Sequence, residues 1–272
     1  MTLPLLIDQI NELNSKWSDN WTSVRQVFES CVQNLGQIND DDADASRKSN
    51  LITAGLAVAN FIEHSCKKMA RSGKEPNYHS RLHTAVVIRS LTALLLEQRR
   101  LNKKKSNIIT REEILVLVAM AGHDAGHNGS RNAHVCQLES RSFRLIQPLL
   151  EAANCDERDI YAIKCIIWST DPTLYARLHN GAKSTDDFDL NQPVWQAVIC
   201  QEADILASSL PQFQKKLTMS LANEWRKLDP MSAEGVMSPG GRKYFLANIA
   251  KFSTPAAHSF GLPKLVDLQL SE

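Results

Sequence analysis

The chain has few of the features that mark several common protein classes. Its 272 residues include 11 Gly and 10 Pro, too few for a turn-rich β-sandwich or a low-complexity chain. Lys and Arg total 31 against 30 Asp and Glu, so the net charge is +1. This balance gives no reason to expect nucleic acid or a membrane as a partner. The longest strongly apolar run, 114–121, is far shorter than the roughly 20 residues that a membrane span requires.

Paired cysteines and a secretion signal are also missing. Six cysteines lie scattered along the chain without any Cys-x-x-Cys pair, which indicates reduced thiols rather than a disulfide framework or a cysteine-rich zinc site. The N-terminus has no basic segment, and Asp8 interrupts its apolar stretch before a signal peptide could form. We therefore expect a cytoplasmic protein.

The hydrophobic pattern is helical along most of the chain, and no alternating strand pattern appears. Thr110 to Glu113 form a capping box before an apolar run, and Pro193 opens a helix that Pro211 stops. We predict an all-α fold, with further helices at about 51–71, 79–100, 134–153, 157–169 and 211–228.

Four of the eight histidines form two close pairs. His79 and His83 are four residues apart on a predicted helix, and His123 and His127 repeat this spacing with Asp124 beside the first. A single such pair arises often by chance. Two pairs in apolar helices, with a carboxylate next to them, favour a site for zinc, magnesium or manganese. We expect the other four histidines to be structural or exposed.

A metal site would need one more ligand from elsewhere in the chain. Asp204 is the best candidate, because it shares a helix face with Ala197 and Cys200, where an unpaired carboxylate is costly. Glu202 points to a different face, and we expect it to be exposed. Asp171 is a weaker candidate, because Thr-Asp-Pro is also an ordinary helix-stop turn.

These residues resemble a known family. The segments Tyr78-His79-Ser80-Arg81-Leu82-His83, His123-Asp124-Ala125-Gly126-His127-Asn128-Gly129 and Ala203-Asp204 are similar to those of the metal-dependent HD superfamily. More narrowly, they resemble the catalytic domain of class I 3′,5′-cyclic nucleotide phosphodiesterases. Asn132, Leu138-Glu139 and Thr170-Asp171 continue the resemblance in order over about residues 50–260.

The resemblance implies a single compact multi-helix bundle around a binuclear metal site. It places the catalytic domain at 51–262, after a helical extension over 1–50 and before a tail at 263–272. The extension would either cap the core or pair two subunits in a homodimer. The implied substrate is a small-molecule phosphoester, with no nucleic-acid or membrane partner.

The resemblance also implies a role for each site residue. His83, His123, Asp124 and Asp204 would hold a zinc ion, and Asp124 would bridge to a second ion, magnesium or manganese. A hydroxide shared by the two ions would attack a 3′,5′-cyclic nucleotide or a related phosphodiester, and His79 would act as the general acid. Two further residues would order the waters of the second ion, His127 and Glu139.

Three departures from the family pattern affect this expectation. Ser80 and Ser140 stand where the family has Asn and His. Phe245 can occupy the position of a purine-stacking Phe, and Arg242 then replaces the Gln that reads the purine, unless Arg242 is a surface residue. Tyr78 is the third expected substrate contact. The alternatives are a general HD phosphohydrolase acting on nucleotides or another phosphoester, and an HD domain that binds a nucleotide without turnover.

Overall fold

The computed structural model describes residues 1–17, 19–39, 41–103, 107–185 and 187–271, and over these residues the fold is all-α as predicted. Gln37 and Ile108 form one isolated bridge, and the described chain contains no β-strand. The helices are α1 (Leu3–Lys16), α2 (Val24–Leu35), α3 (Ala45–Arg71), α4 (Arg81–Leu101), α5 (Arg111–Gly122), α6 (Gln137–Ala152), α7 (Glu157–Ser169), α8 (Tyr175–Lys183), α9 (Pro193–Ser209), α10 (Pro211–Trp225), α11 (Pro230–Met237), α12 (Pro239–Tyr244), α13 (Pro255–Ser259) and α14 (Leu262–Ser271), with a 3₁₀ turn η1 (Pro172–Leu174) and a π-helical turn η2 (Phe245–Ile249).

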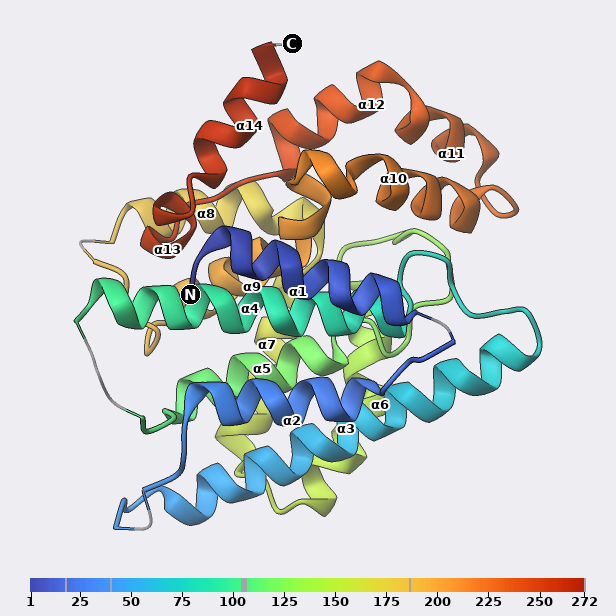
Figure 1. The fold of residues 1–272 in the computed structure, drawn as a ribbon. Helices are drawn as coiled ribbons and strands as arrows, with labels where there is room; N and C mark the ends of the chain where they lie inside the picture. The colour runs from blue at the N-terminus through green and yellow to red at the C-terminus, as the bar shows by residue number, and fades with distance from the viewer. Residues whose placement is uncertain (18, 40, 104–106, 186, 272) are drawn as a thin grey trace.

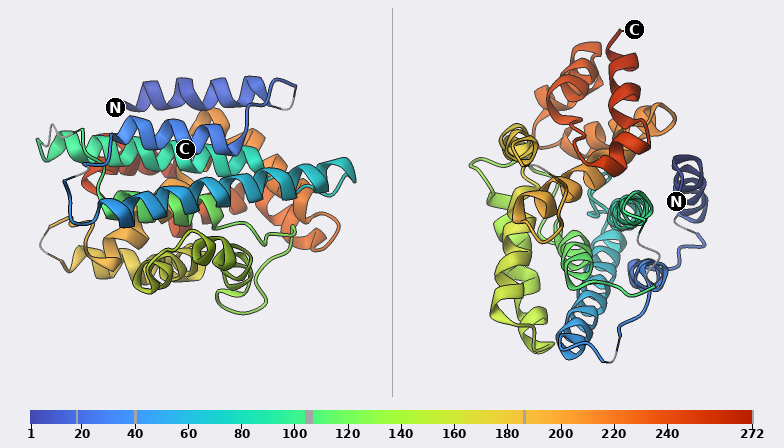
Figure 2. Two further views of the ribbon diagram at one scale, coloured as in Figure 1. Left: turned by 90° about the horizontal axis from the view of Figure 1, so that it is seen from below. Right: turned by 90° about the vertical axis from the view of Figure 1, so that its left-hand side faces the viewer.

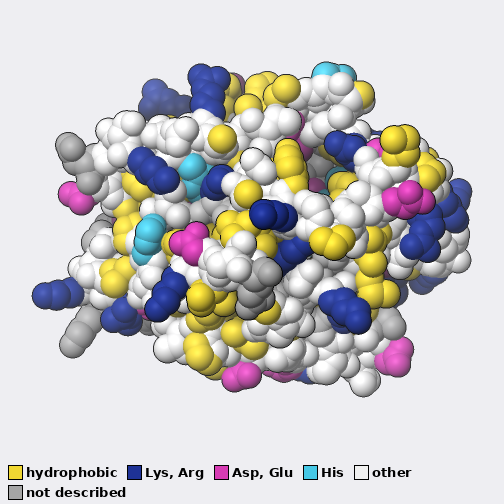
Figure 3. All heavy atoms as spheres, turned by 90° about the horizontal axis from the view of Figure 1, so that it is seen from above, with side chains coloured by type: hydrophobic (Ala, Val, Ile, Leu, Met, Phe, Trp, Pro, Cys, Tyr) yellow, Lys and Arg dark blue, Asp and Glu magenta, His cyan; other side chains and the backbone are white. Residues whose placement is uncertain are grey.

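The helices pack in layers around three central helices, α4, α5 and α9. α4 packs against α9 and α2, and α5 packs against α3 and α7. The axes of α1, α2 and α4 run close to parallel, as the end-on view in Figure 2 shows. α10 to α12 and α14 cover one side of this bundle, the upper side in Figure 1. Figure 3 looks onto that side, where Lys and Arg side chains are interspersed with hydrophobic ones.

Helix α5 is the most completely buried helix of the core. Thr110 and Glu113 form the predicted capping box at its start, which satisfies two backbone N–H groups that would otherwise lack partners. Every residue from Glu113 to Gly122 is buried. The apolar middle therefore anchors the helix, and the polar residues that follow it, His123 and Asp124, are held at the centre of the molecule.

The two ends of the chain are joined to the bundle by helices. α3 runs without a break through the expected domain boundary at residues 50 and 51, and Phe28 of α2 is fully buried in the core. The expected tail is helical as α14. Among the described residues, none of the helices combines the length and the apolar character needed to cross a bilayer. All six cysteines are free thiols.

Helices α2 and α3 approach closely where Gly55 faces the Phe28 ring. A Cβ atom at Gly55 would lie 2.1 Å from the Phe28 Cζ atom, and Phe28 is fully buried. We predict that Gly55→Ala lowers the free energy of unfolding by about 1–3 kcal/mol through overpacking, measured by urea denaturation. The matched control is Gly235→Ala on α11, where nothing lies within 4 Å; it should raise stability by up to about 1 kcal/mol. Equal effects of the two substitutions would contradict this packing account.

Candidate metal centre

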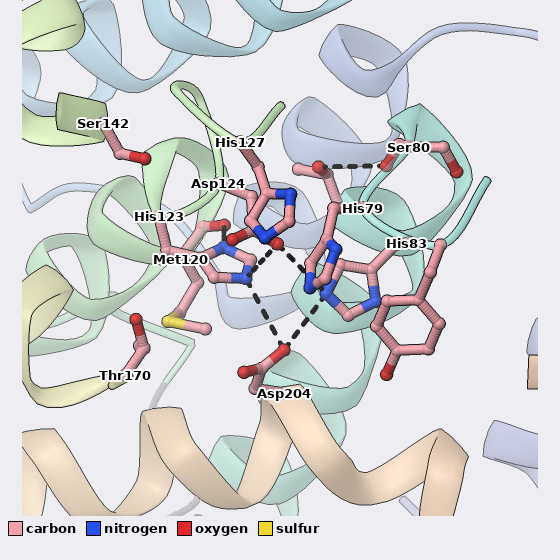
Figure 4. A network of polar contacts seen from close by, with 12 residues as sticks. His79, Ser80, His83, Met120, His123, Asp124, His127, Ser142, Thr170 and Asp204 are labelled. Carbon is pink, nitrogen blue, oxygen red and sulfur yellow. Dashed lines mark hydrogen bonds and ion pairs between the residues drawn. The ribbon is translucent and has the colours of Figure 1, made fainter. Parts of the chain in front are cut away.

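Three central helices bring four charged or polar side chains to one point (Figure 4). His83 lies in the first turn of α4, His123 caps the C-terminal end of α5, and Asp124 follows it. Asp204 reaches the same point from α9. Because α4 packs against both α5 and α9, the core of the bundle itself sets the geometry of this cluster.

The predicted helical spacing of the two histidine pairs is wrong. α4 begins at Arg81, so His79 lies in the loop before it, and α5 ends at Gly122, so His127 lies beyond it. The structure nevertheless brings these two histidines together, with their rings stacked at a centroid distance of 3.5 Å. Loop geometry, rather than one helix face, assembles this half of the site.

Three of the clustered side chains, His83, His123 and Asp124, have ligand atoms within 4.8 Å of one another, and Asp204 lies beside the two histidines. His83 Nε2 lies 3.3 Å from Asp124 Oδ2 and 3.1 Å from Asp204 Oδ1. His123 Nε2 lies 3.0 and 3.5 Å from the same two oxygens. Ligands at about 2.1 Å from an ion stand about 3.0–3.4 Å apart in octahedral or tetrahedral arrangements. The four histidine–carboxylate separations are close to this range.

Within the described part of the chain, three atoms of this cluster are buried without a hydrogen-bond partner: His83 Nε2, His123 Nε2 and Asp124 Oδ2. The two histidine nitrogens lie within ion-pair distance of the Asp124 oxygen, but the angles do not fit a hydrogen bond. Buried polar atoms left in this state are costly, and a divalent cation would satisfy all of them at once. The donor set of imidazole and carboxylate suits zinc, and it also suits harder ions.

Neighbouring groups orient these side chains. His123 Nδ1 lies 2.8 Å from the Met120 carbonyl oxygen, so the Nδ1–H donates there and Nε2 keeps its lone pair for a ligand. The Tyr175 hydroxyl donates to Asp204 Oδ2 at 3.3 Å, which leaves Oδ1 facing the histidines.

The electrostatics of the cluster favour bound positive charge. Burial opposes the charged imidazolium of His83, but Asp124 and Asp204 outweigh it and raise the pKa of His83 to about 9. The same balance raises the pKa of His123 and lowers the pKa values of both aspartates. The two carboxylates thus attract protons to the histidines, and a metal ion would displace those protons.

A second group of three residues, His79, His127 and Glu224, also has metal-ligand spacing, but Glu224 and the Nδ1 atoms of both histidines already have hydrogen-bond partners. Glu224 Oε1 lies 2.5 Å from His79 Nδ1, and Oε2 accepts from the backbone N–H groups of Tyr78 and His79 at 2.8 and 3.0 Å. His127 Nδ1 accepts from the Gly129 N–H at 3.2 Å. This group is therefore a hydrogen-bonded support rather than the tighter metal site.

Glu224 was not found from the sequence, although it touches both loop histidines. Its side chain is 2% exposed and lies 3.5 Å from His127 Nδ1. Burial opposes its charge, but His79 and His127 outweigh that effect and lower the pKa of Glu224 to about 2. Burial, together with His79, lowers the pKa of His127 to about 3, so His127 is neutral at physiological pH.

The other candidate carboxylates have structural partners. Contrary to expectation, Glu202 is fully buried, because it accepts hydrogen bonds from the backbone N–H groups of Ser253 and Thr254 and from the Thr254 hydroxyl. Asp171 caps η1 and accepts from the Cys136 N–H at 2.7 Å.

Glu139 and Asp171 are linked by one side chain. The Asn132 amide donates to both oxygens of Glu139 and, at 3.2 Å, to Asp171 Oδ2. Burial raises the pKa of Glu139, and the charges of Asp171 and Asp124 act in the same direction. Glu139 therefore lies close enough to Asp124 to be influenced by its charge.

The three expected substrate contacts are only partly brought to the cluster. The Tyr78 ring lies 4.8 Å from the His83 ring, and its hydroxyl is 2.7 Å from Ser208 Oγ. Arg242 donates to the Ser208 carbonyl at 2.8 Å and to Gln269, and its guanidinium lies 5.3 Å from the Phe245 ring. Arg242 thus joins α12 to α9 and α14, and within the described residues no hydrogen bond or ring contact of Arg242 or Phe245 reaches a clustered ligand.

Comparison with known proteins places this fold among phosphodiesterase domains. The phosphodiesterase domain of a rhodopsin phosphodiesterase from Salpingoeca rosetta matches with a TM-score of 0.59 at 17% identity, over 92% of this chain and 93% of that one. A second structure of the domain from the same choanoflagellate matches with a TM-score of 0.57 at 17% identity, over 87% and 92%. A yeast protein, caPDE2, matches with a TM-score of 0.50 at 15% identity, over 98% and 74%. No family model and no curated protein sequence matches the chain. The likeness is therefore one of fold.

The cluster predicts which carboxylate controls metal affinity. Asp204→Asn removes one anionic ligand and should weaken zinc binding by at least about 100-fold, since even residues that only support metal ligands account for 10- to 100-fold. Equilibrium dialysis of chelator-treated protein against buffered zinc, followed by elemental analysis, measures this. Asp8→Asn on the exposed face of α1 is the control and should bind zinc normally. Unchanged affinity in Asp204→Asn would show that another carboxylate holds the ion.

Proposed function

We propose that this protein is a metal-dependent phosphodiesterase that hydrolyses a 3′,5′-cyclic nucleotide or a related phosphodiester. The observation that carries the proposal is the convergence of His83, His123, Asp124 and Asp204 on one cation-sized point, next to a solvent-accessible histidine. The phosphodiesterase domains of similar fold support the same reaction class. A small-molecule phosphoester as substrate and a cytoplasmic location are parts of this proposal.

The four clustered residues would hold the tighter ion, zinc, and Asp124 would be shared with a second ion, magnesium or manganese. Bound divalent ions lower the pKa of water towards neutrality and offset the charge of a phosphoryl group. The protein supplies the orientation: His123 presents Nε2 because Met120 engages its other nitrogen, and Tyr175 turns Asp204 towards the histidines.

His79 is the proposed general acid. Its Nδ1 atom is held by Glu224 at 2.5 Å, so Nε2 is the nitrogen left to give a proton to the leaving oxygen of the substrate. The side chain is 17% exposed and can therefore meet a substrate from solvent. Glu224 is a positioning residue, because it binds the His79 ring and the backbone on either side of Tyr78.

His127 and Glu139 would order water beside the second ion. Because the Gly129 N–H donates to His127 Nδ1, the proton of the neutral ring is on Nε2, which is then a donor to a water or a phosphate oxygen. Glu139 is held by the Asn132 amide, and its charge adds to that of Asp124 in attracting a hydrated cation.

Tyr78, Arg242 and Phe245 are the proposed substrate contacts. Ser208 connects Tyr78 and Arg242, because its hydroxyl lies at hydrogen-bond distance from the Tyr78 hydroxyl and its carbonyl accepts from Arg242. Burial lowers the pKa of Arg242 to about 10, so it remains a cation at neutral pH. A donor-only guanidinium matches phosphate and carbonyl oxygens better than the donor–acceptor edge of adenine.

A substrate panel tests the proposal most directly. Zinc- and manganese-loaded protein is assayed with cyclic mononucleotides, cyclic dinucleotides, nucleoside monophosphates and bis(4-nitrophenyl) phosphate. We expect hydrolysis of at least one cyclic or diester substrate. Turnover of monoesters alone would favour a general phosphohydrolase, and binding without any turnover would favour a nucleotide-binding domain.

In the same panel, Arg242→Gln should shift the substrate preference towards adenine nucleotides, and an unchanged preference would remove Arg242 from substrate recognition.

The general acid has a separate test. His79→Gln should lower kcat by at least about 100-fold, the usual contribution of acid catalysis, while the zinc content stays unchanged. Glu224→Gln should also lower kcat with its zinc retained, because it loosens the His79 ring. His258→Gln, an exposed histidine on α13, is the control. Loss of zinc in His79→Gln would instead make His79 a metal ligand, and an unchanged kcat would exclude the acid role.

A further inference from the structure

A second hollow lies away from the metal centre, between α8, the segment that follows η2, and α14. It is a cavity of about 370 Å³, and none of the residues that line it belongs to the histidine site. The apolar part of its lining includes Leu246, Val266 and Leu270. The cavity is at the lower end of the 300–1,000 Å³ typical of small-molecule sites, so it would accommodate a compact ligand.

The floor of this cavity contains a buried polar group. His179 is 2% exposed, and its Nδ1 atom lies 2.8 Å from Ser253 Oγ. Its other nitrogen, Nε2, is buried, and no group of the described chain pairs with it. A buried polar atom without a partner costs about 1–3 kcal/mol, so this nitrogen is suited to meet a polar group of a ligand.

Two lysines give the cavity a positive side. Lys183 at the end of α8 and Lys251 after η2 both line it. Burial, and then the charges of these two lysines, lower the pKa of His179 to about 4. Both lysine charges therefore act on the His179 ring, and that imidazole is neutral at physiological pH. Lys251 donates to the Ala247 carbonyl. Asp267 of α14 also lines the cavity, but it forms no ion pair with either lysine in the described chain.

We propose that this cavity binds a small amphiphilic anion, with its acidic head group between Lys183 and Lys251 and its apolar body against the apolar lining, Leu246, Val266 and Leu270. The neutral imidazole of His179 would supply a hydrogen bond to the head group. The ligand class is a carboxylic acid on a short aliphatic or aromatic body. An uncharged or cationic molecule of the same shape lacks the attraction of the two lysines.

Calorimetric titration of the full chain with octanoate tests the proposal, with 1-octanol and octyltrimethylammonium as matched probes. We expect octanoate to bind at one site and at least tenfold more tightly than either probe. The binding should weaken with added salt. Equal affinities for the three probes would overturn the proposal, because only the apolar lining would then contribute.

Variants locate the site. Lys183→Glu combined with Lys251→Glu should weaken octanoate binding at least tenfold, whereas Lys227→Glu combined with Lys243→Glu makes the same charge change at exposed positions elsewhere and should not. Ala176→Trp fills the cavity from an exposed position and should abolish binding, whereas Ala152→Trp should not. Circular dichroism checks that each variant is folded, and if Ala176→Trp is not, the lysine pair decides. Octanoate binding that survives both cavity variants would overturn the assignment, as would binding that is lost in His123→Gln.

Discussion

Two carboxylates and two imidazoles meet where α4, α5 and α9 converge, and the burial of both imidazoles beside two largely covered carboxylates constrains the rest of the molecule. Asp124 and Asp204 would be costly in an apolar core without positive charge beside them. His83 and His123 provide it by taking up protons, as the raised pKa values show, or a divalent cation provides it in their place. The three helices must then hold the four side chains at fixed positions relative to one another. The almost complete burial of α5 and α9 provides this rigidity.

Two further buried carboxylates connect the C-terminal helices to this centre. Glu224 reaches from α10 to the backbone of residues 78 and 79 and to the His79 ring. Glu202 reaches from α9 to the backbone of residues 253 and 254. Each carboxylate accepts from backbone N–H groups that would otherwise lack partners. The positions of the proposed acid and of the C-terminal segment therefore depend on buried hydrogen bonds rather than on apolar packing alone.

The sequence predicted the helical class and the capping box of α5, because each leaves a local pattern. The four residues that meet in the cluster were named together only through the family resemblance. Asp204 was identified as a carboxylate on an apolar helix face, but Glu202 and Glu224 occupy comparable positions. Their partners lie about 50 and 145 residues away in the chain, so no local pattern distinguishes a metal ligand from a carboxylate that satisfies backbone groups. The loop positions of His79 and His127 were missed for a related reason, because an i,i+4 spacing is also compatible with a turn.

The central claim is that one divalent ion binds between two histidines and two aspartates. X-ray absorption at the zinc edge of the zinc-loaded protein measures this first coordination shell directly. The account predicts only nitrogen and oxygen neighbours at about 2.0–2.2 Å, with two imidazole rings in the outer scattering. A sulfur shell at about 2.3 Å, or a coordination sphere that is unchanged when both His83 and His123 are replaced by Gln, would contradict it.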